Sequence, residues 1–192
     1  MFFSGVARAA DTPVILVVGD SLSAGYGIDQ TQGWVQLLQH KLDTLEQHYR
    51  VVNASISGDT SHGGLQRLPR ILKKWKPRIV IIELGGNDGL RGLSLKSMTG
   101  NLEKMIQLSH QSEAKVLLLG IRLPANYGRR YGERFSSIYP VLAKKYDVPL
   151  VPFMLESVAD KKSLMQVDGI HPRAAAQSIV LGTVFEYLRP LL

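Results

Sequence analysis

The 192-residue sequence predicts an α/β protein, a three-layer α/β/α sandwich with about five parallel strands and helices on both faces. Three observations lead to this prediction. Short apolar runs recur along the chain, segments with helical periodicity separate them, and no internal repeat or linker divides the sequence. We therefore expect residues 11–192 to form a single domain, preceded by a separate extension over residues 1–10.

The predicted strands are apolar and rich in β-branched residues. None of them alternates apolar with polar residues, which is typical of strands buried on both faces of a parallel sheet. They cover residues 13–19, 50–54, 78–84, 115–121 and 148–153.

Three of the segments between or after the strands carry an apolar stripe at helical spacing, which indicates helices packed on a core. The stripes consist of Trp34, Leu37, Leu38, Leu42 and Leu45; of Met98, Leu102, Met105 and Ile106; and of Ile179, Val180, Val184, Tyr187 and Leu188. Right-handed crossovers between parallel strands place all their carboxyl ends along one edge, and ligands bind outside that edge. The polar residues that follow the strands are therefore the candidates for function.

Composition limits the class of protein. Hydrophobic residues make up 45% and charged residues 20% of the chain, as in an ordinary folded protein, and no apolar run reaches the ~18 residues of a membrane span. The net charge of +7 is spread along the chain without a nucleic-acid-binding motif, so we expect no nucleic-acid partner. The absence of cysteine excludes disulfides and cysteine nucleophiles. Nothing in the sequence requires more than a monomer.

The first residues, MFFSGVARAADT, resemble the end of a secretory signal, with a short apolar piece followed by Ala-Arg-Ala-Ala. A charged start and a full apolar region are missing. We interpret residues 1–10 as a signal-peptide remnant or an N-terminal extension, which predicts a periplasmic or secreted protein.

Five residues suited to acyl transfer follow different strands. Ser21 follows the first strand, Gly58 the second and Asn87 the third, while Asp168 and His171 come after the fifth. A serine hydroxyl needs a general base, and the ordinary pKa of histidine near ~6.5 suits that role. A carboxylate must orient the imidazole, and a turn at Gly169 would let Asp168 reach His171. Backbone N–H groups of Ser21 and Gly58 with the Asn87 amide could then bind an oxyanion.

Three carboxyl groups near these positions are predicted to have supporting roles. Asp20, which precedes Ser21, is expected to accept hydrogen bonds from nearby backbone N–H groups. Asp88, which follows Asn87, is expected to support the loop around Asn87. Glu83 ends the third strand, where a buried carboxylate needs a partner.

These residues resemble the four blocks of the GDSL, or SGNH, hydrolases, namely Gly19-Asp20-Ser21-Leu22, Gly58, Gly86-Asn87-Asp88 and Asp168-x-x-His171. Longer stretches, among them SGDTSHGGLQRLP, ELGGNDGLRGL and IRLPANYGRRY, are similar to the bacterial multifunctional thioesterase, lysophospholipase and arylesterase branch. The resemblance extends over nearly everything from Ala10 onward.

The resemblance implies a flavodoxin-like sheet and a periplasmic serine hydrolase without metal or cofactor. It implies that small acyl esters and thioesters are the substrates, including aryl esters, lysophospholipids and acyl-coenzyme A. Ser21 would be the nucleophile, His171 the base and Asp168 its orienting group. Ser21, Gly58 and Asn87 would form the oxyanion hole. The region after the fourth strand would help to line the acyl pocket, with Pro124 and Tyr127 as wall residues.

Two other classes of function remain as alternatives. A non-catalytic, flavodoxin-like ligand-binding module could cradle phosphate after the first strand, although neither a P-loop nor a dinucleotide fingerprint is present. A metal-dependent hydrolase could use Asp20, Asn87, Asp168 and His171 as ligands, although no paired clusters recur. An α/β-hydrolase of the Gly-x-Ser-x-Gly type is excluded because Ser23 stands where its second glycine should be.

Overall fold

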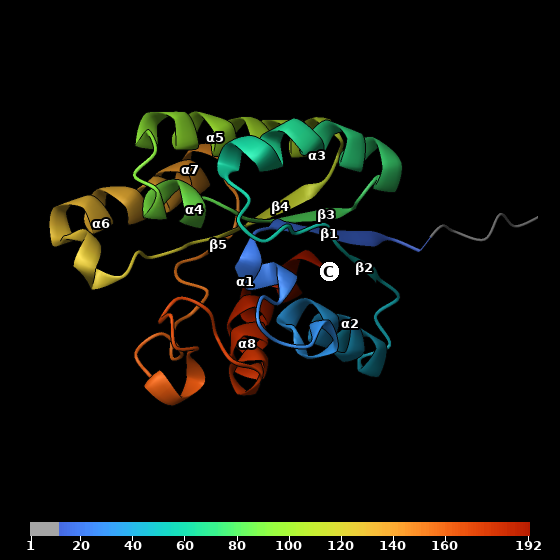
Figure 1. The fold of residues 1–192 in the computed structure, drawn as a ribbon. Helices are drawn as coiled ribbons and strands as arrows, with labels where there is room; N and C mark the ends of the chain where they lie inside the picture. Colours follow the sequence, from blue (N-terminus) through green and yellow to red (C-terminus); the bar gives the residue numbers. More distant parts are fainter. Residues whose placement is uncertain (1–11) are drawn as a thin grey trace, which may run out of the picture.

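Five parallel strands form one sheet in the order β2-β1-β3-β4-β5 (Figure 1), as a computed structural model of residues 12–192 shows. The predicted α/β/α class with parallel strands is thereby confirmed. The order reverses at β1, because the chain first adds β2 on one side and then β3 on the other. The strands are β1 (Val14–Gly19), β2 (Arg50–Asn53), β3 (Ile79–Glu83), β4 (Lys115–Leu119) and β5 (Leu150–Val151).

Helices cover both faces of the sheet (Figure 1), with α3, α5 and α7 on one side and α2 and α8 on the other. The longer helices are α2 (Trp34–Thr44), α3 (Ser61–Trp75), α5 (Leu95–Gln111), α6 (Arg129–Ser136), α7 (Ile138–Tyr146) and α8 (Gln177–Leu188). Two short helices, α1 (Ser21–Ala24) and α4 (Gly86–Leu90), begin at the carboxyl ends of β1 and β3.

Successive strand residues enter opposite cores, which explains the unbroken apolar runs. Ile15 and Val17 of β1 pack with α2 and α8, whereas Leu16 and Val18 pack with α3 and α5. Residues of β3 and β4 divide in the same way. Because both faces are buried, β1 and the central part of β3 are apolar at every position, and Glu83 at the end of β3 is the buried exception among these residues.

Three details differ from the sequence prediction. Leu45 was expected on a buried stripe, but α2 ends at Thr44 and Leu45 is 49% exposed. The fifth strand was expected over residues 148–153, but only Leu150 and Val151 pair with β4, at the edge of the sheet. The β2 strand lies at the other edge, and its residues are half-buried or exposed.

The predicted extension over residues 1–10 lies outside the residues that the structure describes. Within residues 12–192, no helix combines the length and the apolar character needed to cross a membrane.

Candidate active site

Ser21, His171 and Asp168 form a continuous chain of hydrogen bonds at the carboxyl edge of the sheet. The Ser21 Oγ lies 2.8 Å from His171 Nε2, and His171 Nδ1 lies 2.6 Å from Asp168 Oδ2. With its proton on Nδ1, the imidazole donates to Asp168 and presents Nε2 as acceptor to the Ser21 hydroxyl. This geometry is that of a nucleophile, a base and an orienting carboxylate.

A tight turn brings Asp168 back onto His171. Gly169 adopts a φ of +67°, a left-handed conformation that suits glycine, and its N–H donates to Gln166 O at 3.0 Å. The Asp168 Oδ1 then accepts the N–H groups of Ile170 and His171 at 2.9 and 3.0 Å. Partial burial raises the pKa of Asp168, but its hydrogen bonds from His171 and Ile170 outweigh burial and hold the pKa below its ordinary value. Asp168 is thus kept ionised as the partner of His171.

Two backbone donors near the nucleophile are free. In the part of the chain that the structure describes, neither the Ser21 N–H nor the Gly58 N–H has an acceptor. Gly58 has a φ of +79°, and Arg91 Nη2 donates to its carbonyl at 2.9 Å. Gly58 is not among the described residues that line the cavity at Ser21.

The third expected oxyanion donor is already engaged. Asn87 Nδ2 lies 3.1 Å from Asp20 Oδ2 and 3.0 Å from the carbonyl oxygen of Asp59. A side-chain amide has two hydrogens, so both are in use. An oxyanion would have to displace one of these two acceptors or share the amide hydrogen that it receives.

Two buried carboxyl groups, those of Asp20 and Glu83, hold the segment around Ser21 in place. Asp20 caps α1 by accepting the Leu22 N–H at 3.0 Å, while its own N–H donates to Glu83 Oε2 at 3.2 Å. Ser23 Oγ also donates to Glu83 Oε2, at 2.8 Å. Any side chain at Gly19 would collide with this arrangement, because a Cβ there would lie 2.7 Å from Glu83 Oε2. The glycine that precedes Asp20 is therefore required by packing.

Burial dominates the protonation of this pair. Burial raises the pKa of Asp20 to about 6, against smaller lowering by the Leu22 N–H and by His171. Burial and the neighbouring Asp20 carboxylate raise the pKa of Glu83 well above its usual range. Because the folded protein holds these protons more tightly than the unfolded chain, its free energy of unfolding falls as pH rises. For Asp20 alone the full loss is about 3 kcal/mol, and it is complete only about one pH unit above the folded-state pKa of about 6.

Replacing Glu83 by glutamine should weaken this pH dependence. The variant keeps the shape of the side chain but removes a buried carboxyl group whose pKa is raised by burial and by Asp20. We expect its free energy of unfolding to fall less than that of the wild type between about pH 5 and pH 8, as measured by urea titration. The exposed Glu186→Gln variant is the control. An equal fall in wild type and Glu83→Gln would contradict the assignment of Glu83.

A cavity of about 480 Å³ opens at Ser21. It contains Ser21, Asn87 and His171, and most of its other lining residues are apolar, although four charged residues, Asp20, Arg122, Glu156 and Asp160, also line it. The apolar side chains come from the loops that follow β1, β3, β4 and β5, namely Leu22, Leu90, Ile121, Leu123, Pro124, Phe153, Met154, Leu155, Met165 and Ile170. Its volume lies within the ~300–1,000 Å³ of small-molecule sites. Such a cavity suits an acyl chain.

The two expected wall residues differ in their positions. Pro124 lines the cavity, whereas Tyr127 is absent from its described lining and is 37% exposed. Tyr127 lies in the short 3₁₀ turn Ala125–Tyr127, past the last lining residue of that loop, Ala125.

Phe153 is a wall residue that can be truncated to test the acyl pocket. Its ring packs under the Arg122 guanidinium, 4.7 Å from the ring centroid. We expect Phe153→Ala to raise kcat/KM for long-chain relative to short-chain p-nitrophenyl esters, because the cavity is enlarged. The ratio of decanoate to butyrate hydrolysis measures this shift, and Leu45→Ala serves as a distant control. An unchanged ratio would indicate that the acyl chain binds elsewhere.

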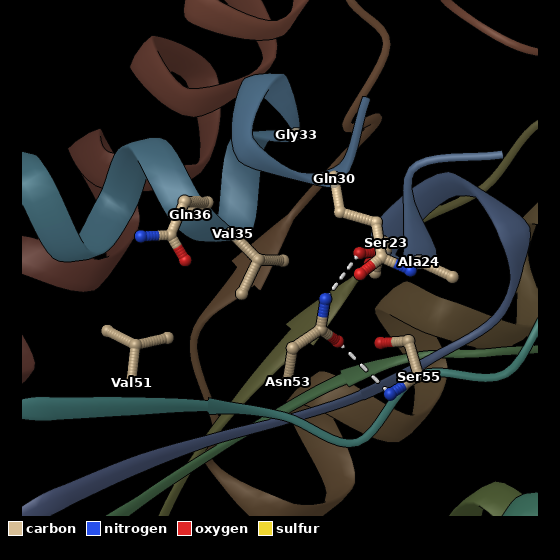
Figure 2. Close-up of a pocket in the computed structure, with 9 residues that line it drawn as sticks. All are labelled: Ser23, Ala24, Gln30, Gly33, Val35, Gln36, Val51, Asn53 and Ser55. Atoms are coloured by element: carbon tan, nitrogen blue, oxygen red, sulfur yellow. Dashed lines mark hydrogen bonds between the residues drawn. The ribbon is translucent and has the colours of Figure 1, made fainter. Parts of the chain in front are cut away.

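A second, smaller cavity of about 230 Å³ is lined in part by Ser23 and Ala24 of α1 (Figure 2), and Ser21 is not among its described lining residues. Figure 2 shows Asn53 between Ser23 and Ser55, donating to Ser23 O at 2.8 Å and accepting the Ser55 N–H at 3.1 Å. Its described lining residues carry no charged side chain and include none of the expected site residues.

Several residues near the site were not singled out by the sequence analysis. The Tyr26 ring packs on the His171 imidazole with centroids 4.6 Å apart. Arg67 pairs with Asp59 at 2.8 Å and also donates to Ala54 O and, at 3.4 Å, to Gly19 O, so it joins the loops after β1 and β2. No local pattern in the sequence marks the Tyr26–His171 and Arg67–Gly19 contacts, because each joins segments far apart in the chain.

Asp88 was expected to support a loop around Asn87, but both residues lie in α4, and Asp88 joins that helix to the start of α3. Its carboxylate accepts the Ser61 N–H at 2.8 Å and the Ser61 hydroxyl at 2.6 Å, and Asn101 donates to that hydroxyl. Among residues 12–192, no three or more His, Asp or Glu side chains are grouped so that they could hold a metal ion.

Comparison with known proteins agrees with this geometry. The profile of the GDSL-like Lipase/Acylhydrolase family matches residues 17–179. The chain is 54% identical to Esterase TesA of Pseudomonas aeruginosa, over 97% of this chain and 93% of that protein. It is 50% identical to Thioesterase 1/protease 1/lysophospholipase L1 of Escherichia coli strain K12, over 96% and 88% respectively.

A solved structure described as TesA superposes with a TM-score of 0.91 at 55% identity, over 93% of this chain and 99% of that one. The fold, the ordered sequence blocks and these similarities agree with one another. The chain is a member of the GDSL-like lipase/acylhydrolase family of hydrolases.

Proposed function

We propose that the protein is a serine hydrolase of acyl esters and thioesters that forms an acyl-enzyme on Ser21. One observation carries the proposal: the Ser21–His171–Asp168 chain, with distances of 2.8 and 2.6 Å, faces a largely apolar cavity. The nucleophile and the space for an acyl chain are therefore adjacent.

In the acylation step, Ser21 Oγ attacks the carbonyl carbon while its proton passes to His171 Nε2. The carbonyl π electrons move onto oxygen, and Asp168 stabilises the imidazolium that forms. When the tetrahedral intermediate collapses, the bond to the leaving group breaks and His171 returns the proton to that alcohol or thiol. A water molecule then attacks the acyl-enzyme by the same route, which releases the acid and restores Ser21.

The developing oxyanion is stabilised by backbone and side-chain donors. The free N–H groups of Ser21 and Gly58 can donate without first losing a partner. Asn87 adds a third donor once one of its contacts with Asp20 or Asp59 is given up. A donor of this kind typically contributes ~3–4 kcal/mol to lowering the barrier.

The substrate range follows from the cavity and the relatives together. The names of the two relatives describe an esterase and an enzyme with thioesterase, protease and lysophospholipase activities. For this chain we propose aryl esters, lysophospholipids and acyl-coenzyme A as substrates. The apolar wall recognises the acyl part, which these three classes share.

Covalent trapping tests the proposal directly. A p-nitrophenyl alkylphosphonate should inactivate the enzyme in step with p-nitrophenol release, and mass spectrometry of peptides should place the adduct on Ser21. Hydrolysis of p-nitrophenyl esters and acyl-coenzyme A is measured in parallel with a chelator present. Ester hydrolysis without labelling, or labelling at another residue, would contradict an acyl-enzyme on Ser21.

The hydrolase function is favoured over a non-catalytic ligand-binding module. A phosphate cradle would not require the Asp168–His171 turn, and the match to a hydrolase family covers residues 17–179.

We also propose that the protein is exported to the periplasm or secreted. The support is the Ala-Arg-Ala-Ala sequence before Asp11, which resembles a signal-peptide cleavage region. Expression of the natural gene followed by cell fractionation and N-terminal sequencing tests this proposal. A protein retained in the cytoplasm with an uncut N-terminus would overturn it.

A monomer should suffice for catalysis, since Ser21, Asp168, His171 and Asn87 all come from one chain. Specific activity that is independent of protein concentration, with a monomeric mass by light scattering, would agree with this proposal. Activity that falls on dilution would contradict it.

A further inference from the structure

Gln166 joins the segment that carries the base to the turn that follows the nucleophile. Its Nε2 donates to the carbonyl oxygen of Tyr26 at 2.8 Å, while the Tyr26 N–H donates to Ser21 O at 3.1 Å. The Gln166 Oε1 packs against Gly27, where an added Cβ would overlap it. The side chain is therefore seated on the backbone of the Ser21 turn.

The same residue is bonded to the His171 backbone on its other side. The Gln166 N–H donates to His171 O at 2.7 Å, and its Nε2 lies 3.3 Å from Pro172 O. The Gly169 N–H donates to Gln166 O, which closes the turn that presents Asp168. Half-buried Gln166 thus contacts both ends of the loop that carries the acid and the base.

Few hydrogen bonds fix the distance between these two segments. Of the hydrogen bonds within residues 12–192, two join residues 20–28 to residues 161–173: the Ser21–His171 bond and the Gln166–Tyr26 bond. The Tyr26 ring, whose own carbonyl is the acceptor, lies against the His171 ring. During turnover the Ser21–His171 bond is broken and re-formed. The Gln166–Tyr26 hydrogen bond is then the one of the two that persists.

We propose that Gln166 is a positioning residue, which holds His171 Nε2 at hydrogen-bonding distance from Ser21 Oγ through its bridge from Tyr26 O to the His171 loop. This inference rests on the proposed function, because it assumes that His171 is the base for Ser21. Gln166 itself does not contact the reacting atoms. Its effect is exerted through the alignment of the base.

Gln166→Met tests the bridge, because methionine has a similar length but no N–H group. We expect kcat for p-nitrophenyl butyrate to fall about 10- to 100-fold, as misplaced catalytic groups do. KM should stay within about twofold, because the acyl cavity does not include Gln166. Rates are normalised to active sites titrated with the phosphonate. The control is Gln111→Met, an exposed glutamine at the end of α5.

A double-mutant cycle separates positioning from a structural role. In a His171→Ala background the base is gone, so adding Gln166→Met should cost almost nothing further. If Gln166 merely stabilised the fold, its substitution would lower the residual rate in that background as well. Thermal unfolding of each variant identifies any loss of folded protein.

Gln166→Glu provides a variant with the same shape that can be rescued by acid. An ionised carboxylate cannot donate to Tyr26 O, whereas a protonated one can. The carboxyl group at position 166 would face the carbonyl oxygens of Tyr26 and Pro172, and these acceptors favour its protonated form because that form can donate to them. We expect the rate of this variant, relative to the wild type at each pH, to rise as the solution is acidified. Asp168 and His171 on the same loop and Tyr26 across it are present in both proteins, so the ratio corrects for them.

The outcomes separate the two proposals. A wild type without ester or thioester hydrolysis would remove the proposed function itself. An active wild type with full activity per titrated site in Gln166→Met would overturn the positioning role alone. Additive losses in the His171→Ala background would also overturn it.

Discussion

Replacing Ser21 by alanine should lower kcat for p-nitrophenyl ester hydrolysis by roughly 10⁴- to 10⁶-fold, the usual cost of removing a serine nucleophile that acts as part of a triad. The expectation follows from the 2.8 Å contact between Ser21 Oγ and His171 Nε2, since no second hydroxyl occupies that position. The protein should remain folded, because Ser21 Oγ has only this one side-chain hydrogen bond within residues 12–192.

The measurement compares initial rates of wild type and Ser21→Ala across p-nitrophenyl esters of graded acyl length, with a chelator present throughout. Ser178→Ala, an exposed serine on α8, is the matched control and should retain the wild-type rate. A Ser21→Ala protein that keeps more than about a tenth of the activity would rule out serine acyl transfer. Chelator-sensitive activity would instead favour a metal-dependent hydrolase.

Replacing Asn87 by alanine should lower kcat by about 10²- to 10³-fold, as the loss of one oxyanion donor typically does. The structure adds a further expectation, because Asn87 Nδ2 already contacts Asp20 Oδ2 and Asp59 O. Its contribution is therefore made when an oxyanion takes the place of one of these acceptors. The interaction belongs to the transition state, so KM should change little.

Steady-state kinetics of Asn87→Ala measure this loss, with exposed Asn126→Ala as the control. Asp20→Asn provides a second comparison, since it replaces the carboxylate that now competes for the Asn87 amide. A loss in Asn87→Ala that is confined to KM would indicate substrate binding instead of oxyanion stabilisation. A loss below about threefold would show that the Ser21 and Gly58 N–H groups suffice.

The sheet could be predicted from the sequence because burial on both faces leaves a direct trace in it. The run from Val14 to Val18 has no polar position, and the structure buries every one of those residues. The edge elements were less well predicted. The β5 strand is short and Leu45 falls outside α2, since apolar character alone does not mark where hydrogen bonding stops.

The candidate catalytic residues could be found because their chemistry requires particular residue types after particular strands. Parallel topology then brings Ser21, Asn87 and His171 to one edge, which needs no knowledge of loop geometry. The acyl cavity was less accessible to such reasoning. Pro124 lines it and Tyr127 does not, because a 3₁₀ turn carries Tyr127 past the cavity.

The sequence by itself determined the class of fold, the family and the candidate residues for acyl transfer, because these depend on residue type and chain order. Only the tertiary structure decided how those residues are held. The engaged Asn87 amide, the buried Asp20–Glu83 pair and the Gln166 bridge all join segments distant in the chain. A hydrogen bond forms only when the distance between donor and acceptor is correct to within a few tenths of an ångström. Residue order does not specify the distances between loops to that precision.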